Sequence, residues 1–243
     1  MIAAAGIGTV IQARMGAKRL PDKVLLPILG RPMLGRVIDR HRLIRHGGRL
    51  VVATTTRAGD DPVAAFCEAE GVDCFRGSET DVLGRFCAAA AEYDLLHVIR
   101  GTGDNPLVDP VLGDELLELY CAEEADYGVS KSVDVDSGLP DGIGLEVFSR
   151  QALELSDRLG HQPHHREHIN EYILENPGRF RVAVLRKATP SGSQGIRLTV
   201  DTAADLRRVE RVYAHFDGRS EAISLEELLQ VGKGLASGLE VPG

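Results

Sequence analysis

Positive side chains crowd one short stretch near the start of the chain, in the run IQARMGAKRLPDKVL that begins at Ile11. Four cations stand there against the single carboxylate of Asp22, a local charge of +4 − 1 = +3: Arg14, Lys18, Arg19 and Lys23. The whole chain carries a net charge of −8, so its other residues sum to −11. A strand that ends at Ala13, followed by a turn with Gly16, can present backbone N–H groups to an anion while the cations neutralise its charge. The stretch therefore predicts a binding site for phosphate groups.

Strand-like and helix-like segments alternate over residues 7–125, and these elements must position the cationic stretch. Apolar runs typical of buried strands lie at 8–13, 49–55, 74–77 and 95–101, and a segment with helical spacing follows each of them. This alternation predicts an α/β fold whose mostly parallel sheet has helices on both faces. Ligands of such sheets bind beyond the carboxyl ends of the strands. We therefore expect the cationic stretch to meet three further loops in one crevice: 54–61, 76–81 and 101–110.

The pattern changes after Tyr127. Residues 128–195 contain a loop rich in Gly, Pro and Asp, two strand-like runs and two helical segments that end near Asn176. We interpret 128–195 as a smaller α+β subdomain inserted into a single domain that covers residues 1–243. The run at 196–200 would be a strand that returns to the main sheet, ahead of a helix over 202–216.

Composition limits the classes of function. Hydrophobic residues make up 43% of the 243 positions and charged residues 26%, which is ordinary for a globular protein. The negative balance argues against nucleic-acid or membrane binding, because either would need a basic face. No apolar run approaches the ~20 residues of a membrane span, and no Lys or Arg precedes the apolar start as in a signal peptide. Because no CxxC pair is present, we expect reduced thiols in a cytoplasmic protein.

The opening stretch resembles a known phosphate-binding signature. It is neither a Walker A loop nor a dinucleotide fingerprint, because GxxxxGK[ST] is absent and Ile11 stands where a third glycine belongs. QARMGAKRLPDKVL is similar to the signature of the cytidylyltransferases that make CMP-activated sugar acids, above all to the SpsF branch, named after a spore coat polysaccharide biosynthesis protein. Further segments resemble this family in the same order over residues 7–206: RGSETDVLGRF, RGTGDNPLVDP, LPDGIGLEVFS, REHINEYI and VDTAADL.

The resemblance implies a nucleotidyltransferase with a Rossmann-like core that binds CTP with Mg²⁺ and releases pyrophosphate. Arg14 and Lys23 would hold the β- and γ-phosphates, where fixed cations favour the departure of pyrophosphate. Lys18 and Arg19 would gate the site. The remaining nucleotide-binding residues implied by the resemblance are Gln12, Ala13, Gly16, Thr54, Arg76, Gly77, Ser78 and Asp104. Ser78 as a helix cap and Thr54 as a plain strand residue are the alternatives.

Two carboxylates are candidates for holding the metal. Asp104 follows the strand-like run at 95–101, and Asp201 follows the run at 196–200. Mg²⁺ is commonly bound by one or two carboxylates together with phosphate oxygens, so this pair could hold one Mg²⁺ against a triphosphate. Asp104 has the alternative role of a turn residue before Asn105, and Asp201 that of a helix N-cap.

The acceptor side is implied by the later motifs. The candidates are Asp141, Glu146, Arg166 and His168, and Arg166 could clamp a carboxylate or a phosphonate with two hydrogen bonds. Solvent-facing strand or helix positions are the alternative for these side chains. The resemblance suggests an ulosonic or nonulosonic acid as acceptor, and a phosphonate or a phosphorylated small molecule is also compatible. It further implies a homodimer through 128–195.

Other functions compete with this one. Asp134 and Asp136 form a DxD motif, which favours a metal-dependent glycosyltransferase that uses a nucleotide sugar. A non-catalytic nucleotide-binding protein is a third possibility. The run HQPHHREH places His164 and His168 four residues apart, at the spacing of one helix face, but it is not HExxH and no cysteine is near. A histidine metal site is therefore the weaker interpretation of that run.

Overall fold

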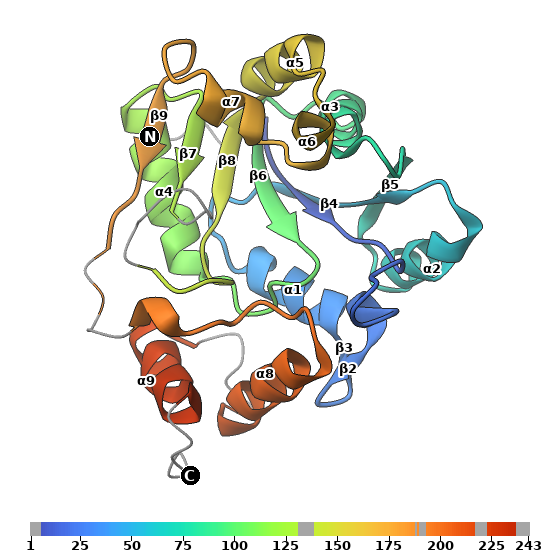
Figure 1. Cartoon of the computed structure of the whole chain (residues 1–243), viewed down its shortest axis with the longest axis vertical. Coiled ribbons are helices and arrows are strands. Elements are labelled where there is room, and N and C mark those ends of the chain that lie inside the picture. The colour runs from blue at the N-terminus through green and yellow to red at the C-terminus, as the bar shows by residue number, and fades with distance from the viewer. Residues whose placement is uncertain (1–5, 131–138, 188, 190–192, 217–222, 237–243) are drawn as a thin grey trace.

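The computed structural model describes residues 6–130, 139–187, 189, 193–216 and 223–236. Its centre is a seven-stranded sheet in the order β5-β4-β1-β6-β8-β7-β9 (Figure 1). Only β8 runs against its neighbours, so the sheet is mostly parallel as the sequence predicted. The strands are β1 (Ile7–Gln12), β4 (Arg49–Thr55), β5 (Asp73–Gly77), β6 (His97–Thr102), β7 (Tyr127–Val129), β8 (Glu146–Ser149) and β9 (Val182–Val184).

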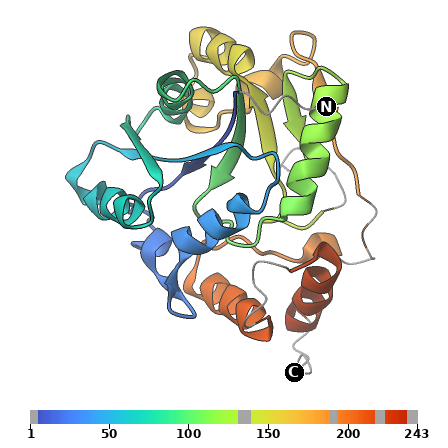
Figure 2. The same cartoon turned by 180° about the vertical axis from the view of Figure 1, so that it is seen from behind.

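Helices cover both faces of the sheet, because alternate strand residues point to opposite sides. Val10 and Val98 pack in one core with α3 (Val82–Glu92), α5 (Arg150–Leu159) and α7 (Glu171–Glu175). Their strand neighbours Ile11 and Ile99 turn to the opposite face. That face is covered by α1 (Met33–Arg42), α2 (Asp61–Ala69) and α4 (Pro110–Ala122), and Figure 2 shows α1 in blue and α4 in green in front of the sheet.

A further core lies beyond the carboxyl end of β6. There α8 (Ala203–His215) and α9 (Leu225–Ala236) pack with Ile28, Met33 and Leu107 (Figure 1). The small hairpin of β2 (Pro27–Ile28) and β3 (Arg31–Pro32) joins this core, and the short helix α6 (Pro163–Glu167) lies beside α3. Three 3-10 turns complete the described elements: η1 (Lys23–Leu25), η2 (Ala58–Asp60) and η3 (Ser193–Gly195).

The structure corrects one expected strand. Residues 196–200 do not return to the main sheet, and they form only an isolated bridge between Asp141 and Arg197. Within 128–195, β8 and β9 extend the main sheet itself, so this region shares the core of the first half. A dimer contact or an acceptor site made by 128–195 stays a prediction.

Two further observations concern the cysteine thiols and the length and polarity of the helices. The four cysteines are all free thiols in the structure, as predicted. In the part of the chain that is described, every helix is too short or too polar to cross a bilayer.

Candidate active site

The loop after β1 is folded back on itself and fastened to the next βα connection. Asp60 accepts a hydrogen bond from the backbone N–H of Met15 at 2.7 Å, and its other oxygen accepts one from the Thr55 hydroxyl. Asp22 N–H donates to the carbonyl of Met15 at 3.1 Å, and Asp22 adopts the left-handed region at φ 57° before η1 begins. These contacts fix the direction in which Lys23 leaves the loop. The pattern of charges along the chain did not predict that Asp60 would hold this loop.

Lys23 lies between the two predicted metal ligands. Its Nζ donates to Asp104 Oδ2 at 2.8 Å, to Asp201 Oδ1 at 3.1 Å and to the backbone carbonyl of Val200 at 2.8 Å. All three ammonium donors are therefore used. The side chain is only 11% exposed, so these charge-assisted bonds are shielded from water. The structure thus brings together three of the four residues predicted to be catalytic.

Asp201 is surrounded by cations. Arg19 lies 2.9 Å from Asp201 Oδ1, and Arg197 donates to Asp201 Oδ2. Burial raises the pKa of this carboxyl, but the Lys23 hydrogen bond and the charges of Lys23, Arg19 and Arg197 outweigh it, so the pKa falls below its usual value. Asp201 is therefore ionised at neutral pH, as the predicted role in metal binding requires. It is not the helix cap, because Thr202 caps α8 and accepts from Asp205 N–H.

The pair Asp104 and Asp201 fits a divalent metal. Two carboxylates from separate segments converge on one cationic atom, the Lys23 Nζ, which shows that both can reach a single positive centre. Two carboxylate oxygens leave most of an octahedral shell for phosphate oxygens and water, as Mg²⁺ prefers. The turn role of Asp104 coexists with this, since Asp104 lies in a turn that is closed by a hydrogen bond from Asn105 N–H to the carbonyl of Thr102 at 3.1 Å.

These groups open into a cavity of about 720 Å³, the cationic cavity. The residues predicted to bind the nucleotide, gate the site or hold the metal that line its wall are Gln12, Ala13, Arg14, Lys18, Arg19, Lys23, Asp104 and Asp201. Arg85 also lines it, and the sequence reasoning missed this residue. Arg85 is 4% exposed and donates to the carbonyl of Ser78. Burial, with the positive charge of Arg14, lowers the pKa of the Arg85 guanidinium, which an incoming anion would relieve.

Other predicted nucleotide residues lie outside this wall. Thr54 is fully buried within β4, and the Ser78 hydroxyl accepts from Asp81 N–H at 3.1 Å. Arg76 donates to the carbonyls of Thr55 and Arg57, at 2.9 and 2.8 Å, and so ties two loops together. Gly77 and Gly16 do not line the cavity either. Nucleotide contacts of these five residues stay predictions.

A second cavity of about 380 Å³, the Arg100 cavity, adjoins the first. Of the predicted acceptor residues, Asp141, Glu146 and His168 line it. Arg100 NH1 lies 2.6 Å from Glu146 Oε2, and the Tyr127 hydroxyl donates to Glu146 Oε1. The glutamate is thus held by a mostly buried cation, 13% exposed, and by a buried hydroxyl. Sequence reasoning placed Arg100 in a strand and missed that its side chain reaches the ligand side.

The two cavities share part of their walls. Five residues line both: Arg100, Thr102, Asn105, Asp141 and His168. Thr102 ends β6, so the cavities meet beyond the carboxyl end of a parallel strand, where α/β sheets bind ligands. A cationic chamber next to a polar one can hold two reactants side by side.

A sequence model of one family covers nearly the whole chain: the model described as Cytidylyltransferase matches residues 9–228. This chain belongs to the cytidylyltransferase family. It is 37% identical to the uncharacterized protein MJ1063 of Methanocaldococcus jannaschii, over 86% of this chain and 83% of that one. It is 33% identical to the spore coat polysaccharide biosynthesis protein SpsF of Bacillus subtilis, over 90% and 91% of the two chains.

Solved structures agree with this assignment. A cytidylyltransferase from Leptospira borgpetersenii superposes with a TM-score of 0.88 at 29% identity, covering 98% of both chains. A CMP:2-keto-3-deoxy-manno-octonic acid synthetase, solved with CTP, has the same fold, with a TM-score of 0.64 at 22% identity over 87% of this chain and 99% of that one. The protein is therefore an enzyme that transfers CMP from CTP, and its fold is the α/β fold of these enzymes.

Arg166 of this cytidylyltransferase lies outside both cavities. Its guanidinium makes a bidentate contact, as expected, but the partner is Asp81 at the start of α3 and not an acceptor molecule. Nε donates to Oδ1 at 2.8 Å and NH2 donates to Oδ2 at 2.6 Å. NH2 also donates to Asp157 Oδ1 at 2.6 Å. The guanidinium therefore joins α3, α5 and α6, and its pKa is raised because these carboxylates outweigh the effect of burial.

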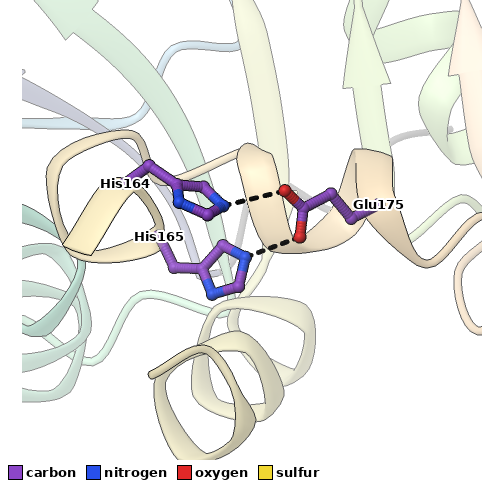
Figure 3. Close-up of side chains that lie close together, drawn as sticks. All are labelled: His164, His165 and Glu175. Carbon is purple, nitrogen blue, oxygen red and sulfur yellow. Dashed lines mark hydrogen bonds and ion pairs between the residues drawn. The ribbon is translucent and has the colours of Figure 1, made fainter. Parts of the chain in front are cut away.

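The histidine-rich run forms a cluster, but with a different membership from the predicted pair. His168 follows the end of α6 and lines both cavities, whereas His164 and His165 donate to the two oxygens of Glu175 at 2.8 and 2.7 Å (Figure 3). Gln162 N–H donates to His165 Nδ1 at 3.3 Å, so the His165 proton belongs on Nε2. A metal ion bound at Nε2 would displace the ring proton to Nδ1, where it would face the Gln162 N–H. The geometry therefore favours a structural role, in which His164 and His165 link α6 to Glu175 of α7.

Proposed function

We propose that this cytidylyltransferase transfers CMP from CTP to a small acceptor that carries an acid group, releasing pyrophosphate in an Mg²⁺-dependent reaction. The observation that carries the proposal is the wall shared by the cationic cavity and the Arg100 cavity, because it would bring an acceptor oxygen beside the α-phosphorus. CTP would occupy the cationic cavity, with its triphosphate on the loop after β1.

Cations of the loop would stabilise the leaving pyrophosphate. Arg14 is about half exposed and lies 3.5 Å from Glu79, an ion pair weak enough to be exchanged for a phosphate. Lys23 would turn from the two carboxylates to a phosphate oxygen, since its ammonium carries a charge that the triphosphate attracts more strongly. Arg85 would contribute a buried positive charge at the same wall. Negative charge grows on the pyrophosphate during transfer, so cations fixed there lower the barrier.

Asp104 and Asp201 would hold the metal. When bound there, Mg²⁺ would neutralise charge on the triphosphate and orient it for in-line attack. Rv0371c of Mycobacterium tuberculosis, which has a similar fold at a TM-score of 0.59 and 22% identity, was solved in complex with manganese. That structure supports a divalent ion for this chain as well, and the convergence of the two carboxylates on Lys23 supports the position.

Asp141, Glu146 and His168 are proposed to face the acceptor, together with Arg100. The Arg100 guanidinium uses NH1 on Glu146, and its remaining donors are suited to the acid group of an acceptor. An ulosonic or nonulosonic acid and a phosphonate both carry such a group. The DxD motif of the glycosyltransferase alternative lies outside the described residues. A homodimer through 128–195 and a cytoplasmic location also remain proposals, which light scattering and fractionation would test.

A pyrophosphate-release screen tests the proposed function. Purified protein with Mg²⁺ would be given CTP, UTP, ATP or GTP against a panel of sugar acids, phosphonates and sugar phosphates. We expect release with CTP and with one class of acid acceptor, and none when Mg²⁺ is chelated. CTP binding, followed by thermal protection, without release for any acceptor would contradict the proposal and favour a non-catalytic nucleotide-binding protein.

A further inference from the structure

Two of the cysteine side chains face each other between α2 and β5. Cys67 lies in the last turn of α2 and is fully buried. Cys74 is the second residue of β5 and pairs in register with Val52 of β4. Val52 belongs to the core that α2 covers, and strand neighbours in register share a face of the sheet. Both thiols therefore point into one core, where they are hydrogen-bonded to each other.

The backbone also keeps the two cysteines close together. Val72 N–H donates to the carbonyl of Cys67 at 2.9 Å, which closes the turn that leads from α2 into β5. Because the thiols are already in hydrogen-bonding contact, a disulfide needs only a small approach of α2 toward β5. The other two cysteines pack with different cores, Cys87 beside α3 and Cys121 on α4.

The two thiols differ in exposure and acidity. Cys74 is partly exposed on the edge strand of the sheet, whereas Cys67 is not exposed. The S–H of Cys67 donates to the Cys74 sulfur, and this bond, with the charge of Arg76, lowers the pKa of Cys74 against the effect of burial. The same bond and burial raise the pKa of the Cys67 thiol. Burial raises the pKa of Cys87 to about 12 and also raises that of Cys121. Cys74 is thus the thiol that ionises most readily.

We propose that Cys67 and Cys74 are a redox site that closes reversibly to a disulfide. The Cys74 thiolate attacks one sulfur of a low-molecular-weight disulfide such as oxidised glutathione, which forms a mixed disulfide and releases one glutathione thiolate. Cys67 then gives up its proton and attacks the Cys74 sulfur, and the second glutathione leaves. The pair loses two electrons and two protons, and oxidised glutathione gains them as two thiols. Excess reduced glutathione reverses both steps.

The redox site lies beside the connection that holds the loop after β1. Asp60 directly precedes α2 and accepts from Met15 N–H, and Arg76 pairs with Asp61 at 2.8 Å. A disulfide has an S–S bond of about 2.05 Å, so its formation draws α2 toward β5. Asp60 moves with α2, which loosens its hold on the loop. The oxidised enzyme therefore binds CTP more weakly than the reduced enzyme.

Peptide mass spectrometry of the folded protein tests for the disulfide. Reduced protein is incubated with oxidised glutathione at mildly alkaline pH, blocked with iodoacetamide and digested. Trypsin leaves both cysteines in one peptide, because no Lys or Arg lies between them, and cleavage after Glu68 or Glu70 then separates two pieces that only a disulfide joins. We expect the joined pieces as the main product, and dithiothreitol should separate them. An unchanged set of free thiols, or oxidation of Cys87 or Cys121 before this pair, overturns the proposal.

Single variants assign the two roles. Cys67→Ser lacks the second attacking thiol, so the mixed disulfide with glutathione should accumulate at Cys74. Cys74→Ser should stay unmodified, because Cys67 is buried. Cys121→Ser is the matched control and should form the disulfide as the wild type does. Equal modification of Cys67→Ser and Cys74→Ser overturns the order of attack.

The wild type tests the same order if a variant fails to fold. Iodoacetamide should alkylate Cys74 before the other three thiols, and faster alkylation of any of those three overturns the assignment of Cys74 as the attacking thiol.

Calorimetric titration with CTP and Mg²⁺ tests the coupling to the nucleotide site. Oxidised wild type should bind CTP about threefold or more weakly than reduced wild type, and dithiothreitol should restore the affinity. Cys74→Ser should bind CTP equally well with and without oxidised glutathione. Equal CTP affinity of the oxidised and reduced wild type overturns the coupling. These measurements need no acceptor, so they stand apart from the pyrophosphate-release screen.

Discussion

Lys23 Nζ lies 2.8 Å from Asp104 Oδ2, with Asp201 Oδ1 at 3.1 Å on the same ammonium. The lysine therefore neutralises the carboxylates that are proposed to hold the metal. A divalent ion and the Lys23 ammonium repel each other at this distance, so the ion should enter together with a triphosphate that draws Lys23 away.

Replacing Lys23 should separate metal binding from turnover. In Lys23→Met we expect kcat/KM for CTP to fall about 10²-fold or more, because a cation at the leaving pyrophosphate is lost. The same variant should bind Mn²⁺ more tightly than the wild type without nucleotide, measured by electron paramagnetic resonance. The control is Lys187→Met, because Lys187 pairs with Glu115 and neither residue lines the two cavities. Equal Mn²⁺ affinity in wild type and Lys23→Met would show that the lysine does not hold the metal position.

Asp201→Asn should abolish Mg²⁺-dependent turnover in a protein that stays folded. The amide keeps the size of the side chain but removes the charge that Mg²⁺ requires. Pyrophosphate release measured against Mg²⁺ concentration, with circular dichroism for the fold, checks this. Near-wild-type turnover with normal metal dependence would remove Asp201 from the metal site.

We expect Asp60 to affect stability and CTP binding indirectly, because it holds the loop after β1 in place. Asp60→Ala removes the acceptor of Met15 N–H and of the Thr55 hydroxyl, leaving buried donors unpaired. We expect a loss of about 1–3 kcal/mol in the free energy of unfolding and a higher KM for CTP. Urea denaturation and initial rates measure the two effects. The control is Asp61→Ala, which removes the neighbouring, exposed carboxylate. Unchanged CTP kinetics in Asp60→Ala would show that holding the loop after β1 does not contribute to CTP binding.

Arg166 offers a direct test between two roles. Its carboxylate partners Asp81 and Asp157 predict that Arg166→Leu lowers the melting temperature and leaves the acceptor KM unchanged. Thermal unfolding and acceptor kinetics in the same preparation distinguish the outcomes. A raised acceptor KM at unchanged melting temperature would restore Arg166 to the acceptor site that its sequence motif suggested.

The neutral His41 of α1, which is buried and lines the Arg100 cavity, should make stability depend on pH. Its folded pKa of about 4 is below its ordinary value of 6.5, so the unfolded chain binds the extra proton between these values. Stability from burying the neutral ring is therefore complete above pH 6.5 and is lost as the pH falls toward 4, by about 1.4 kcal/mol per pH unit at most. The unfolding free energy of the wild type minus that of His41→Phe should therefore fall as the pH is lowered over that range. A difference that stays constant from pH 7 to pH 4.5 would mean that His41 titrates normally when folded.

The fold was predictable because each early βα unit carries a local signature. The apolar runs that became β1, β4, β5 and β6 are followed by segments with helical spacing, and local pattern is enough for such units. Residues 196–200 have a strand-like pattern, but their apolar side chains pack with α8 and α9, and this tertiary packing decided their structure.

The site was predictable where function demands unusual residues close in sequence. The cationic stretch and Asp104 and Asp201 stood out by charge and position, and they meet in the structure. Arg100 and His41 did not stand out, because one sits in a strand and the other in a helix among ordinary neighbours. Only the three-dimensional arrangement, with unpaired atoms facing one cavity, marks them.

The central claim is that one enzyme joins CMP to an acid acceptor in the two adjoining cavities. It is tested most directly by ³¹P NMR of a reaction with CTP, Mg²⁺ and the acceptor that the screen selects. The account predicts one CMP-linked product, with a phosphodiester signal, for each pyrophosphate released, and neither signal in Asp201→Asn. Pyrophosphate without a CMP-linked product, or equal turnover of CTP, UTP, ATP and GTP, would contradict it.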